Sequence, residues 1–385
     1  MKKIIALAIT LILLIAGCSK KDENFKTEEH NGVKIFSNTE MPNDPTAKLE
    51  LKKLFTISSE AQTDTSAYLK KPITLTADNN NNVYILDIYS MSVKKFDSSG
   101  TFVKSIGRMG QGPGELYYPS LIFIYKDTLN IMSVGSQKIS KFDLDGNFYN
   151  EFKLPDRSQL QASKVSRDNQ KVASYIQKFI IKENQQPDID YTLSTLEIPR
   201  LNEKAVIKSQ IFSIQDFRSG KIDFNDLLIP FAPDNDYVYV SENSDNQYRI
   251  FGYDYEGKKK VEIRKDHKMI RYEPAEKEEY IASMKKNIPG DLDIKAGNFK
   301  KAIVAMHIDK YGRLLIYPNV DRNVDKEGVY LDIFKDGMFL NRINYEIHDK
   351  ESLGMIGMGK AMEFFIGDKL YVLKAEDLSV DVYEY

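Results

Sequence analysis

The sequence has 385 residues, a formal net charge of −2 and 42% hydrophobic residues. A chain so close to neutral gives no electrostatic basis for binding a polyanion, so we exclude nucleic acid as a partner. Cys18 is the only cysteine and therefore has no disulfide partner within the chain. The length alone would accommodate two domains.

Residues 1–17 predict a signal peptide. Two lysines, at positions 2 and 3, precede an apolar run of 13 residues from Ile4 to Ala16, which is too short to span a bilayer. Gly17 and Cys18 follow and resemble the bacterial lipobox, in which the cysteine is acylated and becomes the first mature residue. We therefore expect a lipid attached at Cys18 that holds the protein at a membrane. The alternative is an ordinary signal peptide with a chance cysteine.

Residues 18–46 are polar, contain Pro42 and Pro45, and predict a flexible tether. The charged run from Ser19 to Asn24 is similar to the export signal that sends many Bacteroides-type lipoproteins to the outer face of the outer membrane. A solvated tether would have the same composition. The resemblance implies a cell-envelope protein, an outer-membrane lipoprotein exposed at the cell surface.

The stretch from Pro72 to Pro119 predicts one four-stranded antiparallel unit. Two strands flank the turn Asp78–Asn82, a third ends at Phe96, and a fourth ends at Ile106 after a tight turn at Asp97–Gly100. Asp opens such a turn because its side chain can accept hydrogen bonds from the turn backbone. Gly closes it because it accepts a positive φ.

The rest of the chain repeats this unit. The Asp-to-Gly turn recurs at 143–146 and 254–257, and in a shortened form at 336–337. The turn between the first two strands recurs often enough to indicate six units in all. Six short antiparallel sheets predict an all-β fold, a six-bladed β-propeller of four-stranded blades over residues 47–385.

The two ends of this domain predict how the ring closes. The last unit ends at Tyr385 without a fourth strand, and residues 49–57 precede the first complete unit without a sheet of their own. We expect the N-terminal strand to pair with the C-terminal strand in one blade, because an unpaired strand leaves its backbone groups unsatisfied.

Residues 265–301 interrupt the repeat as an insertion. Within it, Pro274 is followed by acidic residues and then by Lys285 and Lys286, and Pro289-Gly290 ends the pattern. That order of charges suits a helix and its dipole. The helix could lie across one face of the propeller, form a lid over the channel mouth, or dock a partner.

The glycine-rich stretch Gly107–Glu115 occurs in one unit only, so the repeat itself does not require it. One interpretation is a shaped connection between blades with an internal ion pair between Arg108 and Glu115. The other is a ligand-binding loop that presents Arg108, Tyr117 and Tyr118 to an anion or a sugar ring, which a guanidinium and aromatic faces suit.

Catalytic residues are sparse. His307 and Glu363 fall on the predicted innermost strands of the fifth and sixth units, where they could converge on a metal or a water molecule. A single strand histidine is more often simply hydrogen-bonded. No GxSxG, HExxH or CxxC pattern appears. We assign no catalytic residue and no metal ligand, and expect no cofactor.

The stretch Ile106–Glu115, with its GRxGxGPGE motif, follows a VKKFD-G-FVKSI hairpin. Together these segments resemble the six-bladed β-propeller lipoproteins of Bacteroides-type envelopes, relatives of NHL-repeat propellers. The resemblance covers the whole mature domain, although residues 160–215 are weakly patterned. It implies a fold and a location in the envelope, and no chemistry.

These observations favour a lipid-anchored binding or assembly module without catalytic activity, whose partner is an envelope protein or a glycan. The alternative is a hydrolase or lyase with a divalent metal in the propeller channel, as in some related propellers.

Overall fold

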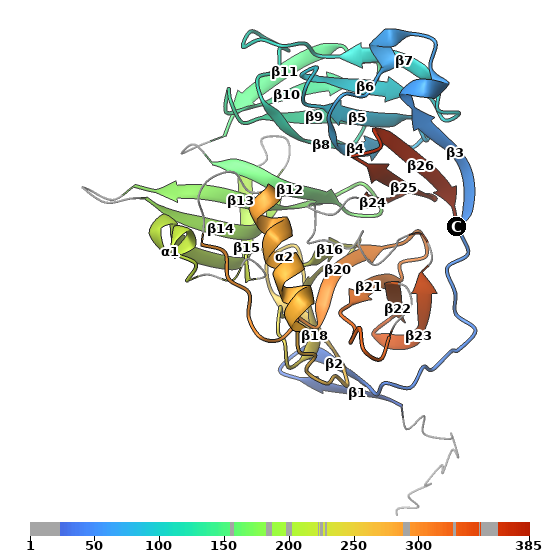
Figure 1. Ribbon diagram of the computed structural model, residues 1–385, viewed down its shortest axis with the longest axis vertical. Helices are drawn as coiled ribbons and strands as arrows, with labels where there is room; N and C mark the ends of the chain where they lie inside the picture. The colour runs from blue at the N-terminus through green and yellow to red at the C-terminus, as the bar shows by residue number, and fades with distance from the viewer. Residues whose placement is uncertain are drawn as a thin grey trace, which may run out of the picture.

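The computed structural model describes residues 24–154, 158–181, 187–197, 202–221, 223, 226–227, 229–287, 293–325, 329–345, 347 and 361–385. In this part of the chain six antiparallel blades are arranged in a ring, as predicted. Figure 1 is viewed approximately along the central axis of the ring, with blades 1 and 2 at the top and blades 4 and 5 at the bottom. No helix among the described residues is long and apolar enough to cross a membrane.

The blades follow one another in sequence order. Blade 1 is β4 (Pro72–Ala77), β5 (Val83–Asp87), β6 (Ser92–Phe96) and β7 (Phe102–Ile106). Blade 2 is β8 (Pro119–Tyr125), β9 (Thr128–Ser133), β10 (Lys138–Asp143) and β11 (Phe148–Lys153). Blade 3 is β12 (Gln159–Val165), β13 (Val172–Ile180), β14 (Asp188–Glu197) and β15 (Asn202–Ser213).

The remaining blades keep the same order, with the first strand innermost. Blade 4 is β16 (Phe231–Pro233), β17 (Val238–Ser241), β18 (Tyr248–Tyr253) and β19 (Lys259–Lys265). Blade 5 is β20 (Ile303–Ile308), β21 (Leu314–Pro318), β22 (Val329–Lys335) and β23 (Met338–Tyr345). Blade 6 is β24 (Ala361–Ile366), β25 (Lys369–Lys374), β26 (Ser379–Glu384) and β3 (Lys52–Ser58).

The turns form as the repeated Asp and Gly predict. Asp97 Oδ1 accepts hydrogen bonds from the backbone N–H groups of Ser99 and Thr101, each at 2.9 Å. Gly100 closes that turn with a φ of +83°. The equivalent glycine of blade 2, Gly146, has a φ of +84°. The equivalent turns of blades 4 and 5 also have a left-handed glycine, Gly257 and Gly337, and Gly adopts this conformation without steric strain.

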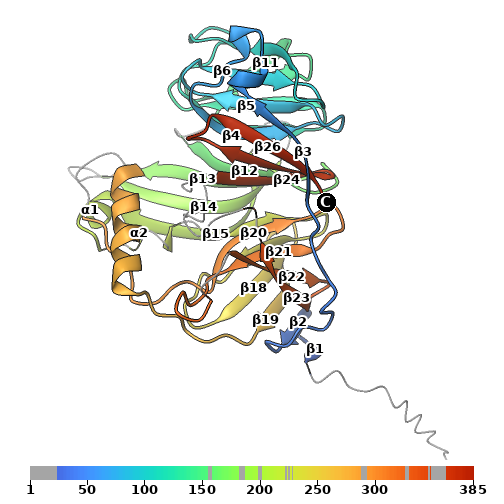
Figure 2. The same cartoon turned by 45° about the vertical axis from the view of Figure 1, so that its right-hand side comes forward.

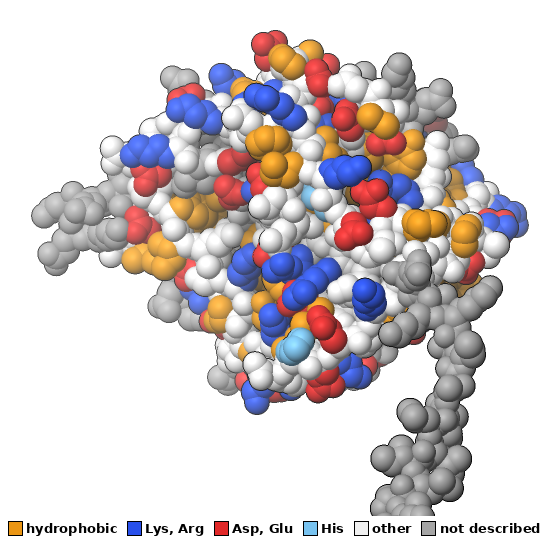
Figure 3. Space-filling view, turned by 90° about the horizontal axis from the view of Figure 1, so that it is seen from below, with side chains coloured by type: hydrophobic (Ala, Val, Ile, Leu, Met, Phe, Trp, Pro, Cys, Tyr) orange, Lys and Arg blue, Asp and Glu red, His pale blue; other side chains and the backbone are white. Residues whose placement is uncertain are grey.

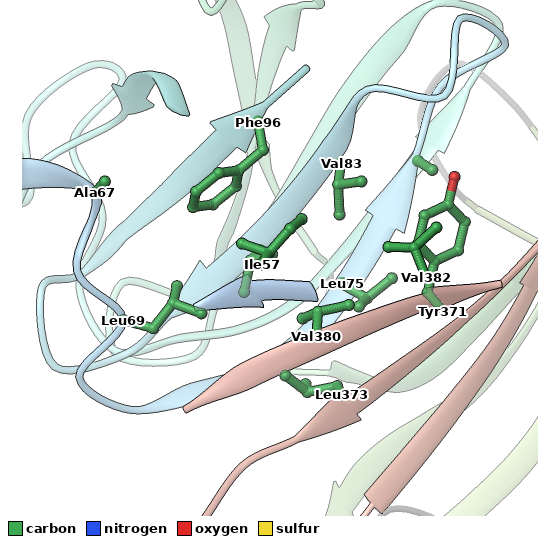
Figure 4. Close-up of a cluster of buried hydrophobic side chains, with 12 residues drawn as sticks. Ile57, Ala67, Leu69, Leu75, Val83, Phe96, Tyr371, Leu373, Val380 and Val382 are labelled. Atoms are coloured by element: carbon green, nitrogen blue, oxygen red, sulfur yellow. The ribbon is translucent and has the colours of Figure 1, made fainter. Parts of the chain in front are cut away.

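The predicted closure of the ring is confirmed. β26 pairs antiparallel with β3, with Val380 opposite Ile57 and Val382 opposite Phe55. Ile57 is fully buried in an apolar cluster between blades 6 and 1. Figure 4 shows Ile57 among Leu75 and Val83 of blade 1 and Val380 of blade 6. The N-terminal strand is therefore part of the core, and it joins both ends of the domain.

Five further clusters of buried apolar side chains lie among the described residues, one at each of the other contacts between neighbouring blades. Because each blade packs between two others, its middle strands are buried on both faces. All five residues of β5 and all five of β6 are buried, for example. This explains the apolar run of β5, whereas β6 also buries Lys94 and Lys95.

The expectation of a flexible tether over residues 18–46 is wrong from residue 24 onward. β1 (Phe25–His30) and β2 (Val33–Asn38) form a hairpin, and β2 pairs in parallel with β19, so the sheet of blade 4 has six strands. The chain then runs along the outside of blade 5, where the N–H groups of Asn43 and Asp44 bond to the carbonyl groups of β23. Figure 2 shows this path from β2 to β3. Cys18 lies outside the described residues.

The predicted helix of the insertion is present as α2 (Pro274–Asn287), and a second, five-residue helix, α1 (Ile214–Arg218), was not predicted. Figures 1 and 2 show α2 beside blade 3. Glu276 bonds to buried Lys300 at 2.6 Å and to Arg322 at 3.1 Å, so side chains just before β20 and just after β21 hold α2 at the open end of blade 5's inner hairpin. This arrangement agrees with a helix laid across one face.

Candidate functional site

The direction of the strands decides which loops share a face of the ring. Successive strands of a blade run in opposite directions. The connection from the fourth strand of one blade to the first strand of the next therefore lies on the same face as the turn between the second and third strands of each blade. We call this the α2 face, because the insertion with α2 is one of these connections. It also carries residues 59–71, 88–91, 107–118 and 134–137. The inner hairpin turns lie on the opposite face.

The glycine-rich loop is shaped by close contacts within itself. Gly107 has a φ of +73°, and a Cβ atom there would lie 2.7 Å from Cδ1 of Leu116, which is fully buried. The Leu116 N–H bonds to the Arg108 carbonyl at 2.8 Å, and the Gly110 N–H bonds to the Leu116 carbonyl at 3.0 Å. The loop therefore folds back on itself in a fixed conformation.

The predicted ion pair is present inside this loop. Arg108 Nη2 and Nε lie 3.0 and 3.1 Å from Glu115 Oε1, and the Gly112 N–H bonds to Glu115 Oε2 at 3.0 Å. The hydrogen bond from the Gly112 N–H is the largest cause that lowers the pKa of the Glu115 carboxyl group, and the hydrogen bond from Arg108 is the second largest. Buried Lys138 donates to the Gly112 carbonyl at 2.7 Å. Glu115 thus holds the loop, whereas Arg108 stays largely exposed.

Tyr117 and Tyr118 follow the loop and are fixed by blade 2. Their rings meet edge to face at 4.6 Å. Their carbonyl groups accept hydrogen bonds from the N–H groups of Gly135 and Val134 at 3.1 and 3.0 Å. A Cβ atom at Gly135 would lie 2.5 Å from Tyr117 Cδ1, so only glycine lets the two loops meet. Tyr118 is 53% exposed.

Two more tyrosines of the α2 face were missed in the sequence. Tyr89 is 72% exposed in the turn between β5 and β6, and Tyr68 is 37% exposed in the connection before β4. Lys70 Nζ lies 5.7 Å from the centre of the Tyr89 ring. The direction of the predicted strands could have identified them, because it places both loops on the same face as Tyr118.

A single buried carboxylate positions these two loops. Asp87 is fully buried at the end of β5. Its Oδ2 accepts hydrogen bonds from the N–H groups of Lys70 and Lys71 at 2.5 and 3.1 Å, and its Oδ1 accepts from the Ser90 N–H at 3.0 Å. The residues that flank Tyr89 and Lys70 are therefore held by the same side chain. We call Tyr68, Tyr89, Tyr117 and Tyr118, with Lys70 and Arg108, the tyrosine group.

His307 and Glu363 lie elsewhere, on the inner strands of blades 5 and 6. Tyr317 Oη donates a hydrogen bond to Glu363, and the His307 ring lies 5.9 Å from the Tyr317 ring and 5.1 Å from the Phe365 ring. The structure therefore brings both predicted residues to one side chain, Tyr317. Burial and the Glu363 charge raise the pKa of the Tyr317 hydroxyl well above its usual value.

The described residues contain no group of three or more His, Cys, Asp or Glu side chains that could hold a metal ion. Charges of both signs are interspersed on the surface seen from below in Figure 3. The tyrosine group combines exposed aromatic rings with loops that are held in place, and we take it as the candidate ligand site.

Comparison with solved structures shows similar folds at low identity. A Bacteroides fragilis protein assigned as exported is 14% identical, with 91% of this chain and 98% of that chain covered and a TM-score of 0.50. A virginiamycin B lyase from Staphylococcus aureus is 10% identical, with 87% and 99% covered and a TM-score of 0.43. A Xanthomonas campestris gluconolactonase is 12% identical, with 82% and 86% covered and a TM-score of 0.36.

No curated protein matches the sequence significantly. The family model described as 6-bladed beta-propeller (DUF5128) matches residues 29–286, which is more than half of the chain. That range begins in the β1–β2 hairpin and ends in α2, so it includes two features that a minimal propeller lacks. The ring of six blades and this match agree, and the chain belongs to the 6-bladed beta-propeller family.

Proposed function

We propose that the protein is a lipid-anchored module of the outer membrane that captures a glycan on its α2 face without catalysing a reaction. The lipobox-like segment ending at Cys18 supports the anchor, and the similarity to an exported Bacteroides protein supports a location outside the cytoplasm. The tyrosine group supports the binding role.

The observation that carries the proposal is the fixed, exposed position of the aromatic rings. Tyr89 and Tyr118 both expose more than half of their surface, yet their loops are held by Asp87 and by the Gly135 contact. Rings held in advance lose little conformational entropy when a ligand binds. Aromatic faces pack against the apolar faces of sugar rings, and an exposed guanidinium such as that of Arg108 donates to hydroxyl or carboxylate oxygens.

The binding role predicts that the tyrosines of the α2 face are needed for glycan capture. Replacing Tyr89 or Tyr118 with Ala removes one ring, and we expect each change to weaken binding by about fivefold, or about 1 kcal/mol. The measurement is binding of the purified protein to an array of bacterial and host glycans, followed by calorimetry with the best ligand.

Tyr311→Ala is the matched control, because Tyr311 is 55% exposed at an inner hairpin turn on the opposite face. This variant should bind like the unchanged protein. A glycan that binds equally to all three variants would contradict the site. Cross-linking on intact cells is a second test. If it joins these tyrosines to one protein, the ligand of the α2 face is that protein and not a glycan.

The anchor predicts a separate result. Cys18→Ala removes the thiol that would be acylated, so we expect the protein to leave the membrane fraction and appear in a soluble fraction. The measurement is fractionation of cells that express each form, and Ser19→Ala is the control that should remain membrane-bound. Retention of the Cys18→Ala protein in the membrane fraction would refute the lipid anchor.

A further inference from the structure

Lys164 places an amine at the centre of the ring. It is the penultimate residue of β12, the inner strand of blade 3. Its Nζ donates to the Phe231 carbonyl of blade 4 at 2.8 Å and lies 3.3 Å from the Met306 carbonyl of blade 5. A side chain that reaches the inner strands of the next two blades must project across the middle of the ring.

The amine has capacity for a further partner. An ammonium group has three N–H donors, and the two carbonyl groups use two of them. Inner strands have one side without a neighbouring strand, so their carbonyl groups need such donors. Among the described residues, no carboxylate forms an ion pair with Lys164. By contrast, buried Lys265 bonds to Asp332 at 2.8 Å, and buried Lys138 bonds to Glu151 at 2.8 Å.

The surroundings of Lys164 contain little negative charge. Strand pairing, together with the neighbouring blade that each position faces, identifies one residue of each inner strand at the level of Lys164. The other five carry no carboxylate: Thr76, Phe123, Ala232, His307 and Phe364. The Phe231 ring lies 4.9 Å from the Lys164 amine. Glu363 belongs to a different position in its strand and accepts a hydrogen bond from Tyr317.

Burial lowers the pKa of Lys164 to about 8. The amine therefore still carries a positive charge in most molecules at neutral pH, without an ion-pair partner in the described part of the chain. Lys164 is half-buried, and a charge partly removed from water in this way is costly unless a counter-charge lies against it. A bound anion would supply that counter-charge.

We propose that the centre of the ring, beside Lys164, binds a small organic carboxylate. One free N–H donor and an aromatic ring suit a monoanion with an apolar part, whereas a phosphate group would need more donors than this level offers. The site lies toward the inner hairpin turns, at the end of the strands opposite the tyrosine group. It is therefore independent of the proposed glycan site.

The first test uses variants and two probes, benzoate and glucuronate. Both should bind saturably to the unchanged full-length protein by calorimetry. Lys164→Met keeps a similar side-chain length without the charge and should weaken binding by about tenfold or more. Lys164→Arg should retain binding. Lys94→Met is the control, since buried Lys94 also donates to a carbonyl group, that of Ser66 at 2.7 Å. Equal binding by Lys164→Met, or no saturable binding of either probe, would overturn the proposal.

The second test needs no variant and decides the question if Lys164→Met does not fold. The unchanged protein is acetylated briefly with an N-hydroxysuccinimide ester, digested, and the modification of Lys164 and Lys94 is quantified by mass spectrometry. Benzoate should slow acetylation of Lys164 at least threefold relative to Lys94 because the anion covers the amine and keeps it protonated. An unchanged ratio would overturn the proposal. A Lys164 that never reacts would also overturn it, because no ligand could then reach the amine.

Discussion

Asp381 links three strands of the blade that closes the ring. Its side chain is 3% exposed on β26. It bonds to Lys53 of β3 and Lys374 of β25, each at 2.7 Å, and accepts a hydrogen bond from the Thr56 hydroxyl at 2.6 Å. Burial alone would raise the pKa of the Asp381 carboxyl group. The hydrogen bonds from Lys374, Lys53 and Thr56 outweigh burial and lower that pKa to about 2.

This depressed pKa predicts how stability depends on acid. A carboxylate whose pKa is lower in the folded protein stabilises the fold above its unfolded-state pKa of 3.8, and that contribution is lost as the pH falls through about 2. Asp381→Asn should therefore reduce the free energy of unfolding by about 2 kcal/mol at neutral pH. The difference from the unchanged protein should shrink as the pH falls from about 4 toward 2.

Urea unfolding between pH 7 and pH 3 measures this effect. Asp236→Asn changes an exposed carboxylate in an inner hairpin turn and should leave the unfolding curve nearly unchanged at every pH. A destabilisation by Asp381→Asn that is as large at pH 3 as at pH 7 would show that the charge of Asp381 is not responsible.

Residues that pair within a short loop could be predicted, whereas those that meet across blades could not. Arg108 and Glu115 are seven positions apart in one loop, and their ion pair follows from charge and spacing. Lys164 meets Phe231 and Met306 only because three blades converge, at separations of 67 and 142 residues. No local pattern marks such a lysine, which in the sequence looks like an ordinary polar residue of a half-exposed strand.

At the scale of elements, the β1–β2 hairpin depends on a glycine of blade 5. Gly337 has a φ of +84°, and a Cβ atom there would lie 2.3 Å from Cγ of Phe36 on β2. Asn38, at the end of β2, donates to the Gly337 carbonyl at 3.0 Å and accepts from the Phe339 N–H at 2.7 Å. The hairpin therefore packs directly on the turn between β22 and β23.

Gly337→Ala should release the hairpin from blade 5. The added methyl group clashes with the Phe36 ring, so we expect faster protease cleavage within residues 24–46 and a loss of about 2 kcal/mol or more of unfolding free energy. Limited proteolysis with mass spectrometry identifies the cleavage sites.

Gly367→Ala provides a matched control for backbone strain. Gly367 has a φ of +59°, and nothing lies within 4 Å of the position a Cβ atom would take. This variant should carry only the left-handed backbone cost of about 1 kcal/mol and leave the hairpin protected. Equal cleavage of residues 24–46 in both variants would contradict the contact with Phe36.

The hairpin also shows why part of the fold escaped prediction. The blades have repeated Asp-to-Gly turns and apolar runs, so their number and order could be read from the sequence. β1 is polar, and its residues are almost all exposed. β2 pairs with β19, which is more than 200 residues away. Composition indicates a tether for such a segment because the surface that orders it belongs to other parts of the chain. The weakly patterned residues 160–215 nevertheless form the longest strands, β14 and β15.

At the scale of the whole molecule, closure of the ring depends on β3. Deleting residues 1–46 removes the hairpin but keeps β3, so we expect a monomer that still unfolds cooperatively with reduced stability. Deleting residues 1–58 also removes Ile57 from the cluster between blades 6 and 1 and exposes the backbone of β26. We expect that protein to associate through the exposed strand or to lose cooperative unfolding.

Size-exclusion chromatography with light scattering, together with urea unfolding, distinguishes the two truncated proteins. A synthetic peptide of residues 49–58 should bind the shorter protein and restore its monomeric state, since it supplies the missing strand. If both truncated proteins are monomeric and equally stable, β3 is dispensable and the ring does not rely on its pairing.

The order of attachments along the N-terminal segment has a mechanical consequence. From residue 24 onward, β1 pairs with β2 and β2 then pairs with β19. The chain next forms backbone hydrogen bonds with β23, and last β3 pairs with β26. A tensile load applied at this end would peel the outermost strand away first. Each later fastening bears force only after the previous one has failed. Under such a load the hairpin would therefore detach before force reaches the β3–β26 pairing that closes the propeller.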